Sequence, residues 1–267
     1  MGRKTVCRMS NLYVVSHPHQ EPSYFYKRSG KVHVPWNTSK GHKRKFVCRG
    51  GEYLKKKVLY KGNLHFWGEY EPPSEAQIMG SARPRAIHNP LFPVRGTVPV
   101  PLNARNTDPY VFGNHFKHIC CGMRGRDYES GDVILFGHIE KEGTNYILSL
   151  ETVFVVDCKV EIDYSRNTTQ YFKAAIGPLV HMKKKFYYQG VKYDKTKNYF
   201  SFVPCQLEYS TKDHPKINLT RYGFIPQNNK GYPWWVNSVP FTCKHWKKII
   251  QDVLKSGWLI GTHIDAI

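Results

Sequence analysis

The chain has 267 residues, enough for one large domain or two small ones with a buried core. It carries 40 Lys and Arg against 20 Asp and Glu, so its formal net charge is +20. No stretch approaches the roughly 20 apolar residues of a membrane helix, and the first residues lack the apolar core of a signal peptide. These features exclude membrane-spanning and secreted classes, and we expect a soluble cytoplasmic protein with no membrane partner.

The cysteines give no sign of a metal site or a disulfide framework. The chain has seven, they are scattered, and no Cys-x-x-Cys pair occurs. His17-Pro-His19 offers two metal ligands but no third at a recognisable spacing. We therefore expect reduced, mostly buried thiols, no metal and no cofactor.

The positive charge is concentrated near the start of the chain. Residues 1–61 contain fifteen Lys or Arg and two acids, whereas residues 62–163 contain thirteen of the twenty acids. Such a field attracts polyanions, so the basic region predicts contact with phosphate, although a solvated basic face is the alternative. The candidate phosphate-binding residues are Lys40, Lys43, Arg44, Lys45, Arg49, Lys55, Lys56 and Lys57.

The first half of the chain favours strands, because aromatic residues make up 14% of the sequence and Val and Ile recur in short runs. Alternation within 63–70 places Trp67 and Glu69 on one face. From residue 71 to 108 the prolines are so frequent that we expect a long irregular surface segment. The strands expected before it are 12–16, 46–48, 58–60 and 63–70.

The central and final regions complete the expected fold. Continuous apolar runs at 133–139 and 152–157 suit strands that are covered on both sides, as in a small closed barrel. Thr242 can cap a helix whose apolar stripe includes Trp246 and Ile249, and Gly257 can end it. Further strands are expected at 146–150, 186–188, 199–203 and 217–219.

These elements predict a mainly β protein with some helix. We expect either a small PUA-like β-barrel or a twisted mixed sheet, with long loops and a C-terminal helix. Residues 1–205 are expected to form one nucleic-acid-binding core that includes the basic region. Residues 206–267 are expected to form an extension whose final helix packs on this core.

Two segments carry the residues that we expect to do chemistry. In Phe66–Ser74, the acids Glu69 and Glu71 flank Tyr70 and lead into paired prolines, so Trp67 can stack on a base while a carboxylate accepts a base-edge donor or acts as general base. The alternative is that Trp67 packs in the core and both glutamates pair with lysines.

The second segment, 105–116, combines turn formers with aromatic residues. An Asx turn before Pro109 is the structural explanation. In the functional interpretation this stiffness holds Asp108 as a catalytic acid. Glu151, between two strands, is a further candidate acid, and the alternative is that it is a bulge or edge residue paired with a lysine. The remaining base-binding candidates are Tyr70, Asn106, Tyr110, Phe112, Asn114 and His115.

Four stretches carry a family resemblance that covers roughly residues 10–205. They are 66–74, 106–113, 131–137 and 151–156, and together they resemble a group of bacterial and phage-associated proteins linked to nucleotide modification and phage defence. The stretch 131–136 is also similar to the central strand of PUA-like domains, which read modified bases. The resemblance implies recognition or chemistry at a DNA base and places function on Trp67, Glu69, Glu71, Asn106, Asp108 and Phe112.

Three functions follow from these patterns. The most concrete is a DNA glycosylase that flips out and excises a modified base, because hydrolysis of the N-glycosidic bond needs a carboxylate beside the cationic sugar. The second is a non-catalytic PUA-like reader of modified nucleic acid. The third is an RNA-binding or ribosome-associated structural protein, for which preference for A-form RNA would be the sign. DNA is the favoured partner over RNA.

Overall fold

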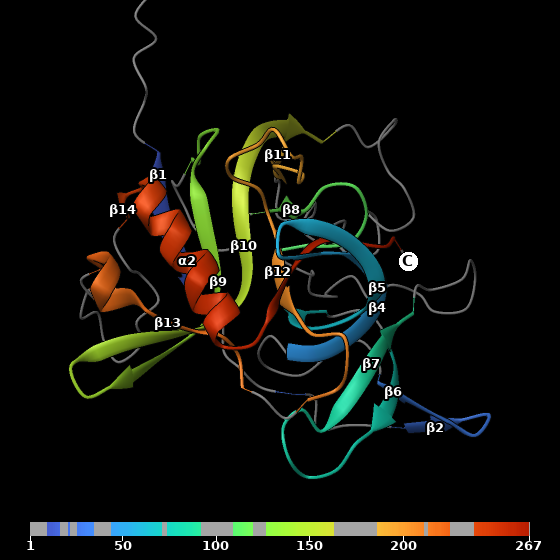
Figure 1. Ribbon diagram of the computed structural model, residues 1–267. Coiled ribbons are helices and arrows are strands. Elements are labelled where there is room, and N and C mark those ends of the chain that lie inside the picture. Colours follow the sequence, from blue (N-terminus) through green and yellow to red (C-terminus); the bar gives the residue numbers. More distant parts are fainter. Residues whose placement is uncertain are drawn as a thin grey trace, which may run out of the picture.

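The computed structural model shows a mainly β protein built around two mixed sheets and one long helix (Figure 1). It describes residues 10–16, 21, 26–34, 44–70, 74–91, 109–119, 127–162, 186–210, 213–224 and 238–266. The two sheets do not close into a barrel. The mainly β class expected from the sequence is confirmed, with two mixed sheets in place of one, and the closed barrel is wrong.

The first sheet is organised around two long strands that form a hairpin. Its order is β14 (Val239–Pro240), β1 (Asn11–Ser16), β9 (Val133–Glu142), β10 (Asn145–Glu161), β11 (Phe186–Gly190) and β8 (Lys117–His118), with β13 (Lys216–Asn218) also paired to β10. β1 runs parallel to β9, and β10 runs antiparallel to it. A register shift interrupts the β9–β10 ladder between Leu150 and Thr152, so Glu151 lies at a bulge.

The second sheet is organised around the hairpin of β4 and β5. Its order is β12 (Val203–Cys205), β15 (Leu259–Ile264), β4 (Arg44–Lys55), β7 (Ala86–Pro90), β6 (Ser74–Ile78), β3 (Lys31–Val34) and β2 (Tyr26–Arg28), with β5 (Val58–Glu69) along β4. The strands β6 and β7 lie in the region expected to be irregular. The prolines did not prevent these two strands from forming, because Pro90 ends β7 and Pro84 lies in the connection between β6 and β7.

The apolar runs are buried on both faces, as the sequence predicted, by two separate clusters. In β9, Ile134 and Phe136 belong to one cluster, and Val133 and Leu135 belong to the other. The helix α2 (Cys243–Lys255) lies across the first sheet in Figure 1 and covers the second cluster with Trp246 and its apolar neighbours. Period-two alternation in β9 thus places successive residues in different clusters.

The last part of the chain contributes to both sheets. α2 begins after Thr242, whose side chain accepts a hydrogen bond from the His245 amide, as expected for an N-cap. The chain then continues past this helix into β15, which lies between β12 and β4. Residues 206–267, expected to be an extension, therefore supply β13 and β14 to the first sheet and β15 to the second.

Candidate functional site

The hairpin of β4 and β5 changes from buried to exposed along its length. At one end, Arg44 pairs with Glu69, and both side chains are buried. At the other end, Lys55 pairs with Val58, and the connecting residues are exposed. We call residues 52–61 the arm, and the buried end its base.

The arm ends in a turn formed by two lysines. Lys56 and Lys57 are the only two residues between the paired Lys55 and Val58, and their φ angles are 50° and 66°. Two successive positive φ angles in a two-residue hairpin loop are the geometry of a type I′ turn, which strongly favours Asn-Gly. Both lysine side chains are exposed. The turn therefore combines an unfavourable backbone conformation with two cations in solvent.

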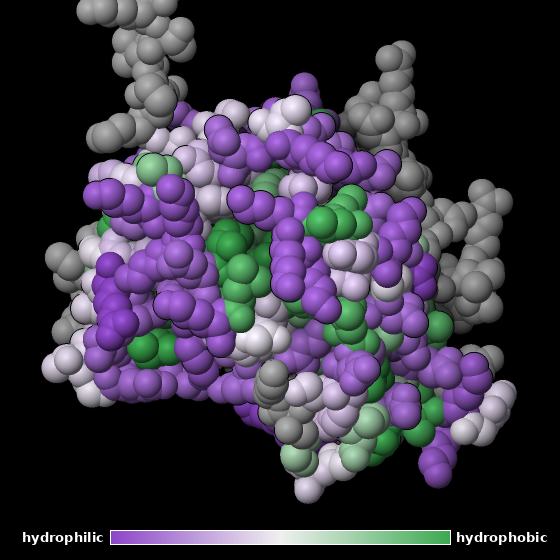
Figure 2. Space-filling view, viewed as in Figure 1, coloured by the Kyte–Doolittle hydropathy of each residue, from purple (hydrophilic) through white to green (hydrophobic). Residues whose placement is uncertain are grey.

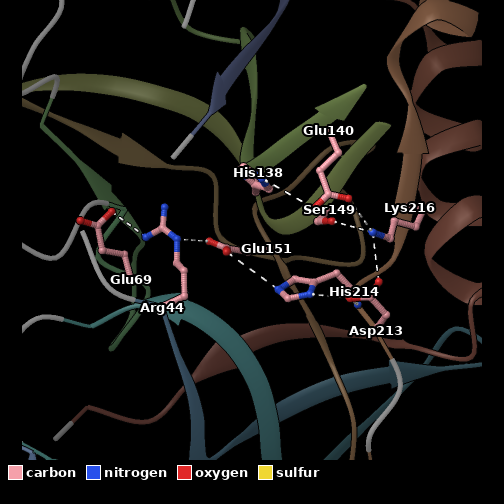
Figure 3. Close-up of polar contacts among 9 residues, drawn as sticks. All are labelled: Arg44, Glu69, His138, Glu140, Ser149, Glu151, Asp213, His214 and Lys216. Carbon is pink, nitrogen blue, oxygen red and sulfur yellow. Dashed lines mark hydrogen bonds and ion pairs between the residues drawn. The ribbon is translucent and has the colours of Figure 1, made fainter. Parts of the chain in front are cut away.

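At the base, one arginine joins carboxylates from both sheets (Figure 3). The Nη1 atom of Arg44 donates to Oε2 of Glu69 at 2.8 Å. Its Nε atom lies 3.0 Å from Oε2 of Glu151, which belongs to β10 of the first sheet. The three side chains are at most 3% exposed, so this ion triad is desolvated and its charges depend on one another.

A line of polar contacts continues from Glu151 toward the surface (Figure 3). Glu151 Oε1 lies 3.9 Å from Nε2 of the buried His214, and His214 Nδ1 lies 3.3 Å from Asp213. Lys216 then lies 3.0 Å from Asp213 and donates to the Ser149 hydroxyl at 3.0 Å. The buried carboxylate is thus linked through a histidine to charges in solvent.

Trp67 lies beside this line as a packing partner. Its ring stacks on that of His214, with centroids 4.8 Å apart and 21° between the planes. Glu69, two residues further along β5, points into the same buried region, where it meets Arg44. Trp67 and Glu69 therefore share a face of the strand, as alternation predicted.

The neighbouring Lys45 is also buried, and it affects a second histidine. Its ammonium lies 5.2 Å from the centre of the Tyr70 ring. His88, whose Nδ1 lies 2.9 Å from the Ser74 hydroxyl, is 1% exposed. Burial and then the charge of Lys45 lower the pKa of His88 to about 3. His88 is therefore neutral in the folded protein at ordinary pH.

The remaining expected site residues are dispersed. Tyr70, Tyr110 and Phe112 pack together in the core, with the Phe112 ring centre 5.5 Å from Tyr70 and 5.4 Å from Tyr110. Asn114 is exposed, and His115 Nδ1 lies 3.4 Å from the Gly190 carbonyl. Five of the expected residues lie outside the described part of the chain: Lys40, Lys43, Glu71, Asn106 and Asp108.

The expected phosphate-binding residues separate into two groups. Arg44 and Lys45 are each 1% exposed and belong to the base, and Arg49 is half-buried. Lys55, Lys56 and Lys57 are exposed on the arm. The sequence did not indicate this division, because a uniform basic run carries no sign of where a strand leaves the core.

Other basic residues escaped the sequence interpretation. The exposed side of α2 carries Lys244, Lys247 and Lys255, and the loop beside it carries Lys192, Lys195 and Lys197. Figure 2 shows hydrophilic residues over much of the face that α2 occupies in Figure 1. The helical spacing of these lysines opposite the apolar stripe was the available signal.

Similarity to known proteins, metal ligation and membrane spans do not identify a function for this chain. No family model, curated protein or solved structure matches the chain. Within the described ranges, no cluster of His, Cys, Asp or Glu has the arrangement of a metal site, and no helix is long and apolar enough to cross a membrane. His17 and His19 lie outside those ranges. Of the four cysteines described as free, Cys205 is buried while Cys158 and Cys243 are exposed.

We expect Arg44→Met to lower the free energy of unfolding by about 3–5 kcal/mol, because it removes one partner of a buried ion cluster and leaves two carboxylates together. Urea denaturation measures this change. Arg49→Met, at a half-buried arginine on the same strand, is the control and should cost less. Equal losses in the two variants would show that the triad does not stabilise the junction of the sheets.

Acid should destabilise the protein partly through His88. Its pKa is about 3 when folded and about 6.5 when unfolded, so its contribution is complete above pH 6.5 and is lost as the pH falls toward 3. Asp213, whose pKa is lowered by its hydrogen bond to His214, adds a loss below about pH 4. His88→Asn should flatten the fall in stability between about pH 6.5 and 4. An unchanged slope in this window would contradict the assignment.

Proposed function

We propose that the protein binds nucleic acid, with DNA as the favoured polymer, through phosphate contacts made by the arm. The single observation that carries this proposal is the turn of Lys56 and Lys57. Lysine is a poor choice for two successive positive φ angles, where Asn-Gly would cost less. Local strain of this kind points to a functional use of the side chains.

The charge around the turn supports the same conclusion. Lys55, Lys56, Lys57 and Lys61 project from the arm, and Glu52 is the acid within residues 52–61. Glu52 lies 3.7 Å from the Lys61 ammonium and is itself partly exposed. The lysines of α2 extend the positive field, which attracts a polyanion over about one Debye length and makes binding sensitive to salt.

Replacing the turn with its preferred sequence should separate stability from binding. We expect Lys56→Asn with Lys57→Gly to raise the melting temperature, because both residues tolerate positive φ. The same change should reduce the slope of log K against log salt for duplex DNA by about 1.8, since each neutralised phosphate contributes ~0.9. Thermal melting and binding titrations at several salt concentrations measure the two effects.

The control removes the same charge elsewhere. Lys195→Asn with Lys197→Asn lowers the net charge equally, in an exposed loop whose lysines have no positive φ. This control variant should not raise the melting temperature, and it should change the slope of log K against log salt less than the turn variant does. Equal slopes in the two double variants would mean that overall charge, not the arm, governs binding.

A second candidate function rests on the buried end of the β4–β5 hairpin, around Arg44 and Glu69. Trp67 stacks on His214, which lies 3.9 Å from Glu151, and Arg44 joins Glu151 to Glu69, so an aromatic ring and two carboxylates lie in one cluster. This supports the proposal of a pocket for a flipped base, used either by a glycosylase or by a PUA-like reader. The cluster is buried, so a base would reach Glu69 only after covering side chains had moved.

Variants of the candidate catalytic carboxylates distinguish a glycosylase from a reader. If the protein removes a base, Glu69→Gln or Asp108→Asn should lower the rate of abasic-site formation in modified DNA by a hundredfold or more, about the contribution of a positioned acid or base. Glu69→Gln also weakens the buried ion triad, so its melting temperature is measured first, and duplex binding by the folded protein should stay largely intact in both variants. Tight binding of modified DNA by the wild type without any abasic product would exclude the glycosylase and favour the reader.

A further inference from the structure

We propose that one face of the arm binds unpaired nucleotides, with a base stacked on Tyr60. This inference rests on the proposed function and names its substrate class as single-stranded nucleic acid. The cross-strand pair Tyr53 and Tyr60 carries it. Their rings are stacked, with centroids 5.6 Å apart and 24° between the planes.

The two rings differ in exposure, and this difference makes Tyr60 the binding group. Tyr53 is 8% exposed and belongs to the core, whereas Tyr60 is 45% exposed. Tyr53 thus supports one side of the Tyr60 ring and fixes its orientation, while much of Tyr60 remains in solvent. A flat aromatic surface held in this way matches the stacking platforms of single-strand binding proteins.

Exposed apolar side chains extend the surface on both sides of Tyr60. Val58 lies two residues before it on the same face of β5 and is 51% exposed. Two residues after it, Gly62 has no side chain, and Leu207 fills that side: its Cδ2 lies 3.7 Å from the position that a Cβ on Gly62 would occupy. Leu207 is itself 37% exposed. The face is therefore a row of apolar groups with an aromatic ring at its centre.

The charges beside this row select the partner. Lys55 shares the face of Tyr53 by alternation along β4, and the exposed Lys56 and Lys57 follow it in the turn. Lys61 lies on the opposite face of β5, beside Glu52. A ligand that fits must present flat apolar surfaces and regularly spaced negative charges together. Single-stranded nucleic acid does so, whereas a duplex keeps the faces of its bases stacked inside.

The test compares ligands of equal charge that differ in their bases. Two labelled single strands of equal charge are used, oligothymidine and an abasic oligonucleotide, each about 12 nucleotides long. A duplex of the same length, which carries about twice that charge, reports phosphate binding without exposed base faces. Binding is followed by fluorescence anisotropy at fixed salt. Wild-type protein should bind oligothymidine roughly five- to 150-fold more tightly than the abasic strand, the range expected for stacking of one base.

Variants at Tyr60 then locate the effect. Tyr60→Ala should lose that preference and leave binding to the abasic strand unchanged, and Tyr60→Phe should retain the preference because it keeps the ring. Leu254→Ala, at an exposed apolar residue on α2, is the control. Melting temperatures close to that of the wild type would show that each variant folds.

The outcomes separate the two proposals. If oligothymidine and the abasic strand bind equally, or if Tyr60→Ala keeps the preference, stacking on Tyr60 is wrong while phosphate binding by the arm survives. If no probe binds, both proposals are wrong. Binding to anionic lipid vesicles that depends on Tyr60, without binding to any oligonucleotide, would also overturn both and identify a membrane surface as the partner.

Discussion

The ion triad of Arg44, Glu69 and Glu151 is the interaction that connects the parts of this structure. Glu151 comes from the first sheet, and Arg44 and Glu69 come from adjacent strands of the second. A buried arginine needs compensating carboxylates, because an unpaired charge in the interior costs several kcal/mol. The requirement to keep all three groups together therefore fixes how β10 meets β4 and β5. Glu151 lies at the bulge of β10, and its carboxylate is 3.0 Å from the arginine.

This constraint lets one hairpin serve two purposes. Its base is anchored by ion pairs and by the stacking of Trp67 on His214, and β15 pairs with β4 as far as Leu54, so the direction of the two strands is fixed. Its arm carries lysines and a supported tyrosine into solvent, where they need no tertiary partner. A rigid support reduces the entropy lost when a ligand orders the exposed side chains. The proposed binding surface thus depends on packing some distance from it.

Local patterns were sufficient to predict many of the strands. The runs at 133–139 and 152–157 are apolar throughout, and such runs are buried on both faces whatever the topology. The helix after Thr242 was recognisable from its cap and stripe. β15 escaped because Gly, Thr and His dilute its apolar pattern, and its position between β12 and β4 depends on distant chain. Arg44 and Glu151 are 107 positions apart in sequence numbering, so no local pattern could pair them.

The central position of β15 delays completion of the second sheet while the chain is being synthesised. Its Thr262 hydroxyl donates to the Glu52 carbonyl, 210 positions earlier in the chain. At the usual rate of synthesis, roughly 5–20 residues per second, β4 waits on the order of ten to forty seconds for this neighbour. During that interval part of β4 and the edge of β12 have unpaired backbone groups, which are templates for association with other chains. The nascent chain therefore has an interval in which chaperones would act, and that interval ends only when β15 has left the ribosome.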